Sequence, residues 1–330
     1  QVVLRRNENY WGPKPKLRKI VYKFITNATA AIQALRSHKV DIVIPEPDQF
    51  AELADDKQFN KEFMCLSYWN PGVPFYYIGW NQNRVFFSDK RVRRAMTLIV
   101  DRERIVSELL KGHGRVTSGP FFIEGNGNDP NIKPWPYDPA RAEQLLTEAG
   151  WIDSDGDGVR DKDGVPFRFE FMYSADSALY RRLAKFIKDE AARVGIEVVP
   201  APFEWSVVIS RVIDRDFDAM VMGWGGDVLE DFYQIFHSSQ IANRGSNYVG
   251  FENPQADAIL EQIRRTFDKA ERDHLCHRFH RILHEEQPYT FLFTRPTFRL
   301  VDRRFRNVKI YKLGPKYWQW YVPKELQRYK

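Results

Sequence analysis

Two tryptophans and one aspartate frame a short apolar segment of this chain, and together they could hold the amino end of a small molecule. Trp205 precedes the segment at residues 218–222, and Trp224 and Asp227 follow it directly. The apolar run is typical of a buried strand, and ligands of α/β proteins usually bind where such strands end. An indole face attracts both ammonium groups and apolar side chains. No Lys or Arg adjoins Asp227 in sequence, so a half-buried carboxylate there would take its positive partner from a ligand.

A polar pair further along the chain could extend this candidate site. Asn247 and Tyr248 follow a glycine- and serine-containing segment, and their side chains could add hydrogen bonds to the same ligand. An alternative stays open for the principal residues, because Trp224 would equally suit a core and Asp227 would equally suit a helix cap.

An acidic loop is a second candidate site, and its spacing fits a calcium loop. Aspartates fill loop positions one, three, five and nine, and Gly156 at position six allows a sharp turn. The predicted ligands are Asp153, Asp155, Asp157, Val159 through its backbone oxygen, and Asp161. Position twelve is Gly164, so the bidentate glutamate of an EF-hand is absent, and an acidic hairpin turn is the alternative. A bound calcium would be structural, fixing the loop between a helix and a strand.

Four histidines form a stripe with spacings of three and four residues. His274, His277, His280 and His284 would share one side of a helix, which could accept a transition metal. The zinc pattern His-Glu-x-x-His is missing, so an amphipathic helix is the alternative. The chain also lacks a Gly-x-Ser-x-Gly elbow, a phosphate loop and a dinucleotide fingerprint. We therefore predict a protein that is not an enzyme and requires no cofactor.

Composition indicates a globular protein of two lobes. The chain has 330 residues, of which 43% are hydrophobic and 28% charged, and no apolar run is long enough to span a bilayer. The net charge is +6, but basic residues occur in many segments with acidic ones among them, so we expect no nucleic-acid partner. Cys65 and Cys276 lie far apart in sequence and are interpreted as free, buried thiols.

An ordered set of short motifs resembles the solute-binding proteins of bacterial ABC importers, family 5, which include the oligopeptide and dipeptide binders. The pattern of Glu204-Trp205, a strand, and then Trp-x-x-Asp is its most specific part. The other matching segments, in chain order, are residues 7–12, 31–35 with 40–42, 92–96 with 101–102, 137–139, 149–151 and 247–254. His38 stands where the family usually has a glycine. The strand before Trp224 also lacks the basic residue that often meets a peptide carboxylate, so an ammonium contact is better supported.

The resemblance implies an α/β fold of the type II, Venus-flytrap periplasmic-binding-protein class. A strand–helix–strand pattern at residues 20–44 predicts a parallel sheet in the first lobe. Aromatic strands at residues 75–80 and 289–293 are interpreted as lobe crossings. We therefore expect residues 1–79 to form part of the first lobe, residues 80–290 a complete cleft lobe, and residues 291–330 a return to the first. Family members are longer, so we expect this chain to be a carboxyl-terminal portion.

The resemblance also implies a function. The chain would belong to the substrate-binding component of an ABC importer, which closes around a peptide or a related amine-bearing solute. Asp227 would meet the ammonium group, and Trp224 and Trp205 would wall the pocket. The expected protein is monomeric, periplasmic or a cell-surface lipoprotein with its export signal absent from this chain, and docks on membrane permease subunits. Two alternatives stay open: a non-peptide solute such as a nickel complex, sugar or opine, and a metal-dependent enzyme that uses the histidine stripe.

Overall fold

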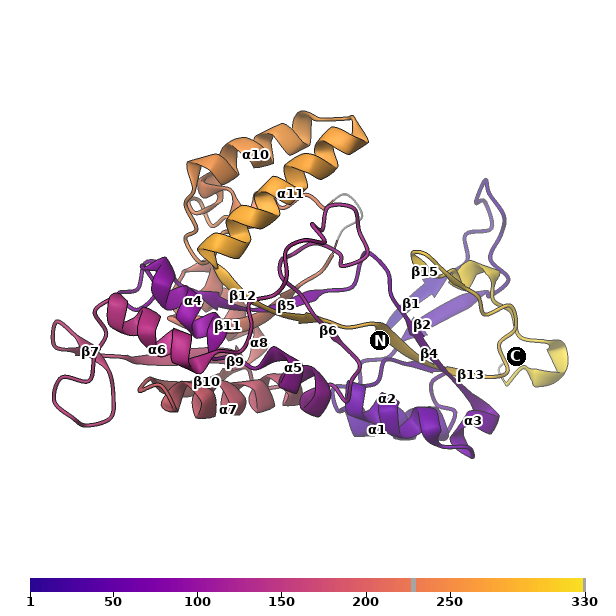
Figure 1. Cartoon of the computed structure of the whole chain (residues 1–330). Coiled ribbons are helices and arrows are strands. Elements are labelled where there is room, and N and C mark those ends of the chain that lie inside the picture. The colour runs from indigo at the N-terminus through magenta and orange to yellow at the C-terminus, as the bar shows by residue number, and fades with distance from the viewer. Residues whose placement is uncertain (227–229, 329–330) are drawn as a thin grey trace. The chain divides into compact units, whose positions relative to one another are not determined.

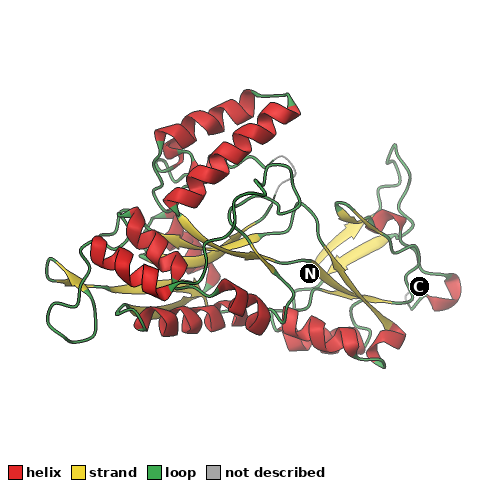
Figure 2. Ribbon diagram, viewed as in Figure 1, coloured by secondary structure: helices red, strands yellow, loops and turns green. Residues whose placement is uncertain are grey.

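The computed structural model describes residues 1–226 and 230–328, and the chain divides into two compact units, each of mixed α/β architecture (Figures 1 and 2). Unit 1 comprises Gln1–Val73, Leu110–His113 and Arg295–Lys330. Unit 2 comprises Pro74–Leu109 and Gly114–Thr294. The limits expected at residues 79/80 and 290/291 fall inside two strands of unit 2, because those strands pair along their whole length with others of the same sheet.

Unit 2 is built on a six-stranded sheet with the order β10-β9-β11-β5-β12-β6. Its strands are β10 (Glu197–Phe203), β9 (Arg168–Ser174), β11 (Ala219–Trp224), β5 (Phe75–Trp80), β12 (Tyr289–Thr294) and β6 (Arg115–Val116). The pairs β10–β9 and β9–β11 are parallel, whereas β5 runs antiparallel to both β11 and β12. Strands β9 to β12 therefore all end at one side of the sheet, which we call the carboxyl edge.

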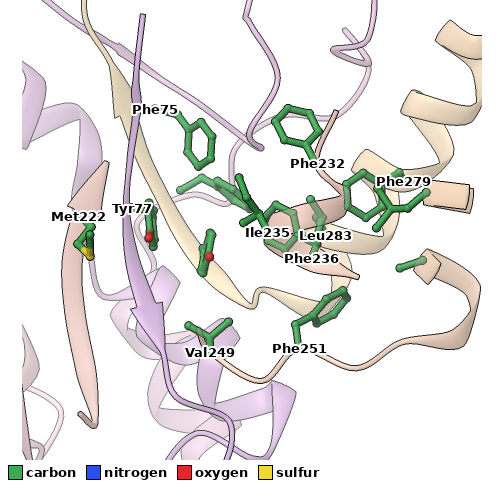
Figure 3. Close-up of a cluster of buried hydrophobic side chains, with 14 of the residues drawn as sticks. Phe75, Tyr77, Met222, Phe232, Ile235, Phe236, Val249, Phe251, Phe279 and Leu283 are labelled. Carbon is green, nitrogen blue, oxygen red and sulfur yellow. The ribbon is translucent and has the colours of Figure 1, made fainter. Parts of the chain in front are cut away.

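One face of this sheet is covered by helices from the later part of unit 2 (Figure 1). They are α8 (Trp205–Ile213), α9 (Tyr233–Phe236), α10 (Pro254–Arg265) and α11 (Lys269–Glu286), with the 3₁₀ turn η2 (Ser238–Gln240). Phe236, Phe279 and Leu283 from these helices meet Tyr77 and Met222 from the sheet in one apolar cluster (Figure 3). Burial of such aromatic and aliphatic side chains is the main favourable contribution to folding of this layer.

The opposite face carries a chain of stacked and edge-on aromatic rings. Trp80 lies 4.9 Å from Phe87, and Phe167 lies 4.4 Å from Trp151, measured between ring centroids. The regular elements of this region are α4 (Lys90–Leu98), α5 (Arg102–Arg104), a π-helix at Ile105–Leu109, α6 (Pro139–Glu148), α7 (Ala178–Ala192) and the hairpin β7 (Asp161–Lys162)–β8 (Val165–Pro166). Residues 90–109 do not form one continuous helix. The Asp101 carboxylate accepts the N–H of Arg104 at 2.9 Å and starts a new helix there.

Unit 1 contains small antiparallel sheets. Strand β13 (Thr297–Asp302) lies between β3 (Ile42–Val43) and β4 (Phe63–Tyr68), while β1 (Val2–Arg5) and β2 (Lys19–Tyr22) form a separate hairpin. Helices α1 (Ala28–Arg36), α2 (Pro47–Asp55) and α3 (Phe59–Glu62) share a core with β13. The parallel sheet predicted for residues 20–44 is therefore wrong, because β3 pairs with a strand from the far end of the sequence.

The end of the chain adds short elements to unit 1. These are β14 (Ile310–Tyr311), β15 (Gly314–Pro315), η3 (Tyr317–Gln319) and η4 (Lys324–Leu326). Both cysteines are free, as predicted: Cys65 is partly buried and Cys276 is buried. Within residues 1–226 and 230–328, no helix has the length and apolar character needed to cross a bilayer.

Candidate functional site at the carboxyl edge

The carboxyl edge places an indole in register with two neighbouring strands. Trp224, the last residue of β11, lies opposite Phe75 of β5, and Phe75 lies opposite Thr294 of β12. Trp224 is only partly buried, and its ring stacks on that of Tyr248 with centroids 5.7 Å apart and planes 14° apart. Both rings pack against the apolar cluster of Figure 3. The structure thus brings two of the predicted site residues together as one aromatic wall.

Asn247 supports this wall through hydrogen bonds within its own loop. Its side chain is fully buried, and its Nδ2 donates to the Phe251 carbonyl at 2.8 Å and to two other backbone oxygens. Its Oδ1 accepts the N–H of Phe251 at 3.0 Å. Because every polar atom of the amide is occupied, Asn247 shapes the loop that presents Tyr248. A ligand contact by Asn247 stays a prediction, which these internal hydrogen bonds do not favour.

Trp205 lies at the same edge but apart from the pair. It is the first residue of α8, directly after β10, and its side chain is 46% exposed. The buried residues Val208 and Val212 follow at helical spacing, so Trp205 continues their apolar stripe toward solvent. Strand β9 separates β10, which precedes Trp205, from β11, which ends at Trp224, so these two strands are roughly 10 Å apart. A ligand contact by Trp205 stays a prediction.

Asp227, the central residue of the sequence hypothesis, lies outside the described residues. The chain is described again from Glu230, which sequence reasoning missed. The Glu230 carboxylate is partly buried, and its Oε1 accepts the N–H of Phe122 at 2.9 Å. A Cβ at Gly125 would come within 3.0 Å of this oxygen, and one at Gly127 would collide with Oε2. Two glycines thus let a loop close over the carboxylate, and burial raises the Glu230 pKa.

The residues that follow Glu230 are anchored as well. Asp231 forms an ion pair of 2.8 Å with Arg264 of α10 and accepts the N–H of Tyr233. The Arg264 guanidinium lies 3.9 Å from the centroid of the Tyr233 ring. The Asp231 carboxylate therefore anchors the start of this segment to α10. The sequence alone does not indicate this contact, because Arg264 lies in a different element.

The acidic loop brings three of its predicted ligands together. Oxygens of Asp153, Asp155 and Asp157 lie within 4.8 Å of one another, and all three residues are exposed. Asp161 instead accepts two hydrogen bonds from Ser154, its N–H at 2.9 Å and its hydroxyl at 2.7 Å, which lower the Asp161 pKa. The N–H of Val159 donates to Asp157 at 2.7 Å. The clustered carboxylates suit a hard cation, and the calcium site stays a prediction.

The histidine stripe serves a packing role along α11. His277 and His284 each use Nε2 on a backbone carbonyl, of Asn126 at 2.8 Å and of Lys133 at 3.0 Å. Buried His280 accepts the N–H of Asp129 through Nδ1 at 3.2 Å, which leaves its protonated Nε2 to donate to the Ser118 hydroxyl at 3.1 Å. Exposed His274 does not join these contacts.

These contacts tie the long segment at residues 118–133 to α11. Burial lowers the His280 pKa to about 4. Among residues 1–226 and 230–328, the only group of three His, Cys, Asp or Glu residues with converging ligand atoms is the acidic loop. The described part of the chain therefore gives no support to a metal centre on the histidine stripe.

Ligand sites of α/β proteins usually lie at the carboxyl ends of their strands, and comparison with known proteins shows which class this chain represents. The chain belongs to the bacterial extracellular solute-binding proteins of family 5, whose model, described as the family 5 middle region, matches residues 1–244. Structural neighbours of this family also bear out the predicted type II binding-protein fold.

Among curated proteins, the chain is similar to the oligopeptide-binding protein AppA of Bacillus subtilis. The two are 34% identical over 321 residues, which cover 96% of this chain and 57% of AppA. The dipeptide-binding protein of Escherichia coli is 24% identical over 310 residues, covering 93% of this chain and 55% of that protein. The chain thus spans somewhat over half the length of the curated relatives it matches.

Solved structures agree with the sequence comparison. The structure of AppA from Bacillus subtilis in complex with a nonapeptide has a TM-score of 0.87 and 31% identity, and covers 98% of this chain and 64% of that one. NikZ from Campylobacter jejuni in complex with Ni(L-His) has a TM-score of 0.83 at 24% identity, covering 96% and 64% of the two chains. At that identity the second likeness shows the fold alone.

Proposed function

We propose that the chain forms the larger part of the substrate-binding component of an ABC importer that captures peptides. The observation that carries the proposal is the aromatic wall of Trp224 and Tyr248 at the carboxyl edge, in a chain 34% identical to an oligopeptide-binding protein. Flat, partly exposed rings at the edge of a sheet offer the contact surface that an extended peptide needs.

In this proposal Asp227 neutralises the α-ammonium of the peptide, and Trp224 lines the space for its first side chains. Trp205 forms an outer wall, while Tyr248 is fixed behind Trp224 by the loop that Asn247 holds. Peptide backbone groups pair with the protein as an added strand would. Affinity for the closed state drives closure, and the closed protein engages membrane permease subunits.

Further parts of the proposal follow from the family. The protein acts outside the cytoplasm, in the periplasm or on the cell surface, and as a monomer. A calcium ion in the acidic loop would be structural, held by Asp153, Asp155 and Asp157, whose oxygens already converge. Family members are solute-binding proteins, and catalysis forms no part of the proposal.

Calorimetric titration with alanine-rich peptides of two to nine residues tests the proposal. Each peptide is used with a free amino end and with an acetylated one. We expect binding of the free form only, and we expect Asp227→Asn to lower its affinity at least thirty-fold, since an unpaired buried charge costs about 2 kcal/mol or more. Asp55→Asn, at an exposed carboxylate of unit 1, serves as the matched control.

The outcomes separate the candidate functions. Equal affinity for free and acetylated peptides would remove the ammonium contact. Absence of peptide binding, with binding of a nickel–histidine complex, a sugar or an opine, would favour the non-peptide alternative on the same fold.

A further inference from the structure

The two ends of the sequence share a charge imbalance that the peptide site does not explain. Residues 1–23 contain seven Lys or Arg and one acidic residue, and residues 303–330 contain nine and one. The whole chain has 50 basic and 44 acidic residues, so residues 24–302 contain 34 basic and 42 acidic ones. The positive charge of the protein is therefore carried by its two terminal segments, while the remainder is net negative.

The fold brings these two segments together in unit 1. The N–H of Lys16 donates to the Trp318 carbonyl at 3.4 Å, and Lys16 Nζ lies 5.0 Å from the centroid of the Tyr321 ring. Between the segments lies a pocket of about 320 Å³ whose lining includes Lys14, Lys16 and Lys309. Segments nearly 300 residues apart in sequence thus place three ammonium groups around one hollow.

The wall of this pocket is built from rings and amides that hold one another. Tyr311 donates its hydroxyl proton to the Gln319 side-chain oxygen at 2.6 Å, and Asn307 Nδ2 donates to the Gln319 carbonyl at 3.2 Å. Tyr311 and Trp318 also line the hollow. We call the side chains of Lys14, Lys16, Lys309, Tyr311 and Trp318 the basic pocket.

The lysines of the basic pocket have little internal compensation. Lys14 lies 4.0 Å from Glu8, with both side chains more than half exposed. For Lys16 and Lys309, the part of the chain that the structure describes provides no carboxylate within 4.0 Å. Exposed ammonium groups gathered around a hollow favour an anion, because the anion offsets their mutual repulsion.

Exposed apolar and amphipathic side chains occur in this lining and next to it in the chain. Trp318 lines the pocket, the Tyr321 ring lies near Lys16 Nζ, and Leu313 is in the turn between β14 and β15. Leu313 is 68% exposed, Trp318 43% and Tyr321 38%. Lysines beside exposed indole, phenol and leucine side chains are the combination found where proteins lie on a membrane interface. The rings suit the headgroup region, and the lysines attract anionic lipid.

We propose that the basic pocket docks on anionic phospholipid, with a headgroup phosphate in the hollow and Trp318 and Leu313 at the level of the headgroups. Two observations favour a lipid surface over a small anion or an acidic protein segment. The two terminal segments contain many basic residues besides the three pocket lysines and only two acidic ones, and the exposed apolar side chains would add nothing to the binding of a soluble anion. This surface would hold the protein near the membrane whatever solute it carries.

Vesicle flotation tests the proposal with the chain as it stands. Vesicles of phosphatidylcholine alone are compared with vesicles that also contain phosphatidylglycerol, at low and at physiological ionic strength. We expect binding only to the anionic vesicles, weakened by salt. The variant K14E/K16E/K309E should bind on the order of a hundred-fold less tightly, and Trp318→Ala several-fold less.

A matched charge control separates a local site from net charge. K57E/K61E/K188E changes three exposed lysines by the same total charge and should keep most of the binding. An equal loss in both triple variants would overturn the proposal. Binding of inorganic phosphate or of an acidic peptide without any vesicle binding would overturn it as well. If the triple variant fails to fold by circular dichroism, Lys309→Glu alone decides the question, with Lys61→Glu as its control.

Discussion

The carboxyl edge of unit 2 and the basic pocket of unit 1 differ in the side chains that they offer to a ligand. The edge presents rings on a six-stranded sheet, backed by a continuous apolar cluster and by fully bonded polar groups such as Asn247. The basic pocket is assembled from turns and short strands, and its charges stand largely in solvent. In the two proposals, the edge binds its ligand through contacts of fixed geometry, and the basic pocket attracts its ligand through positive charge. Substitutions at the edge should therefore change peptide affinity, and substitutions in the basic pocket should change salt-dependent binding to vesicles.

The largest expected effect concerns the foundation of the edge and comes from His280. Its folded pKa of about 4 lies below the ordinary value of 6.5, so the unfolded chain binds the proton more readily between these two values. The neutral ring contributes its full stability above about pH 6.5. That contribution, about 3 kcal/mol, is lost progressively as pH falls toward about 4.

Chemical unfolding at several pH values measures this loss. His280→Gln should be less stable at neutral pH and show a flatter dependence, whereas His274→Gln, at an exposed histidine of the same helix, should follow the parent. Burial also lowers the His284 pKa, which makes stability fall with falling pH as for His280, and raises the Glu230 pKa, which has the opposite effect on stability. Both groups are present in parent and variant, so the difference between the two proteins isolates His280. An unchanged slope in His280→Gln would contradict the assignment.

A reciprocal pair of substitutions sharpens the contrast between the two regions. Trp224→Ala should weaken peptide binding about thirty-fold, because it removes an aromatic anchor worth about 2 kcal/mol. Trp318→Ala should leave peptide affinity unchanged and affect only vesicle binding. Calorimetry and flotation on both variants measure the two effects. Loss of peptide affinity in Trp318→Ala would show that the regions do not act separately.

The Glu230 contact offers a smaller effect that tests how rigid the edge must be. Gly127→Ala should cost about 1–2 kcal/mol of stability and lower peptide affinity, since the new methyl group would displace the carboxylate. Glu230→Gln keeps an oxygen for the Phe122 N–H and should cost less than 1 kcal/mol. Thermal melts and calorimetry measure both. A Gly127→Ala protein with native affinity would separate this loop from the site.

The acidic loop should give the smallest effect. Calcium addition should raise the melting temperature by a few degrees and chelation should reverse it, without changing peptide affinity, because the ion would act only on a surface loop. Asp155→Asn should abolish the shift, and Asp163→Asn, outside the carboxylate cluster, should preserve it. Identical melts with calcium and with chelator would leave the hairpin interpretation in place.

Local patterns in the sequence were sufficient where neighbouring residues determine the outcome. The four histidines of the stripe lie on one helix, α11, as their spacing predicts. Strand β5 has the predicted limits at residues 75 and 80, because its run of aromatic residues is typical of a strand and shows no helical spacing. Trp224 lies at the end of a buried strand, as the apolar residues before it indicate.

Long-range pairing and side-chain partners could not be predicted in this way. Strand β3 pairs with β13, more than 250 residues away in sequence, so no local period announces their antiparallel sheet. Asn247 has the composition of a ligand contact, yet four backbone groups bind it internally. Glu230 gave no local signal either, because its partners lie in a loop about 105 residues earlier.

Trp224, Phe75 and Thr294 lie opposite one another in three neighbouring strands. This register sets the distance from the indole to two points where the chain passes between the units. Only Pro74 separates Phe75 from the unit boundary at 73/74, and Thr294 is the last residue before the boundary at 294/295. A shift at the tryptophan therefore needs to cross just two interstrand spacings, roughly 10 Å, to reach two of the points where the chain passes to unit 1, at 73/74 and 294/295. Backbone pairing within one sheet therefore connects the indole to both of these points.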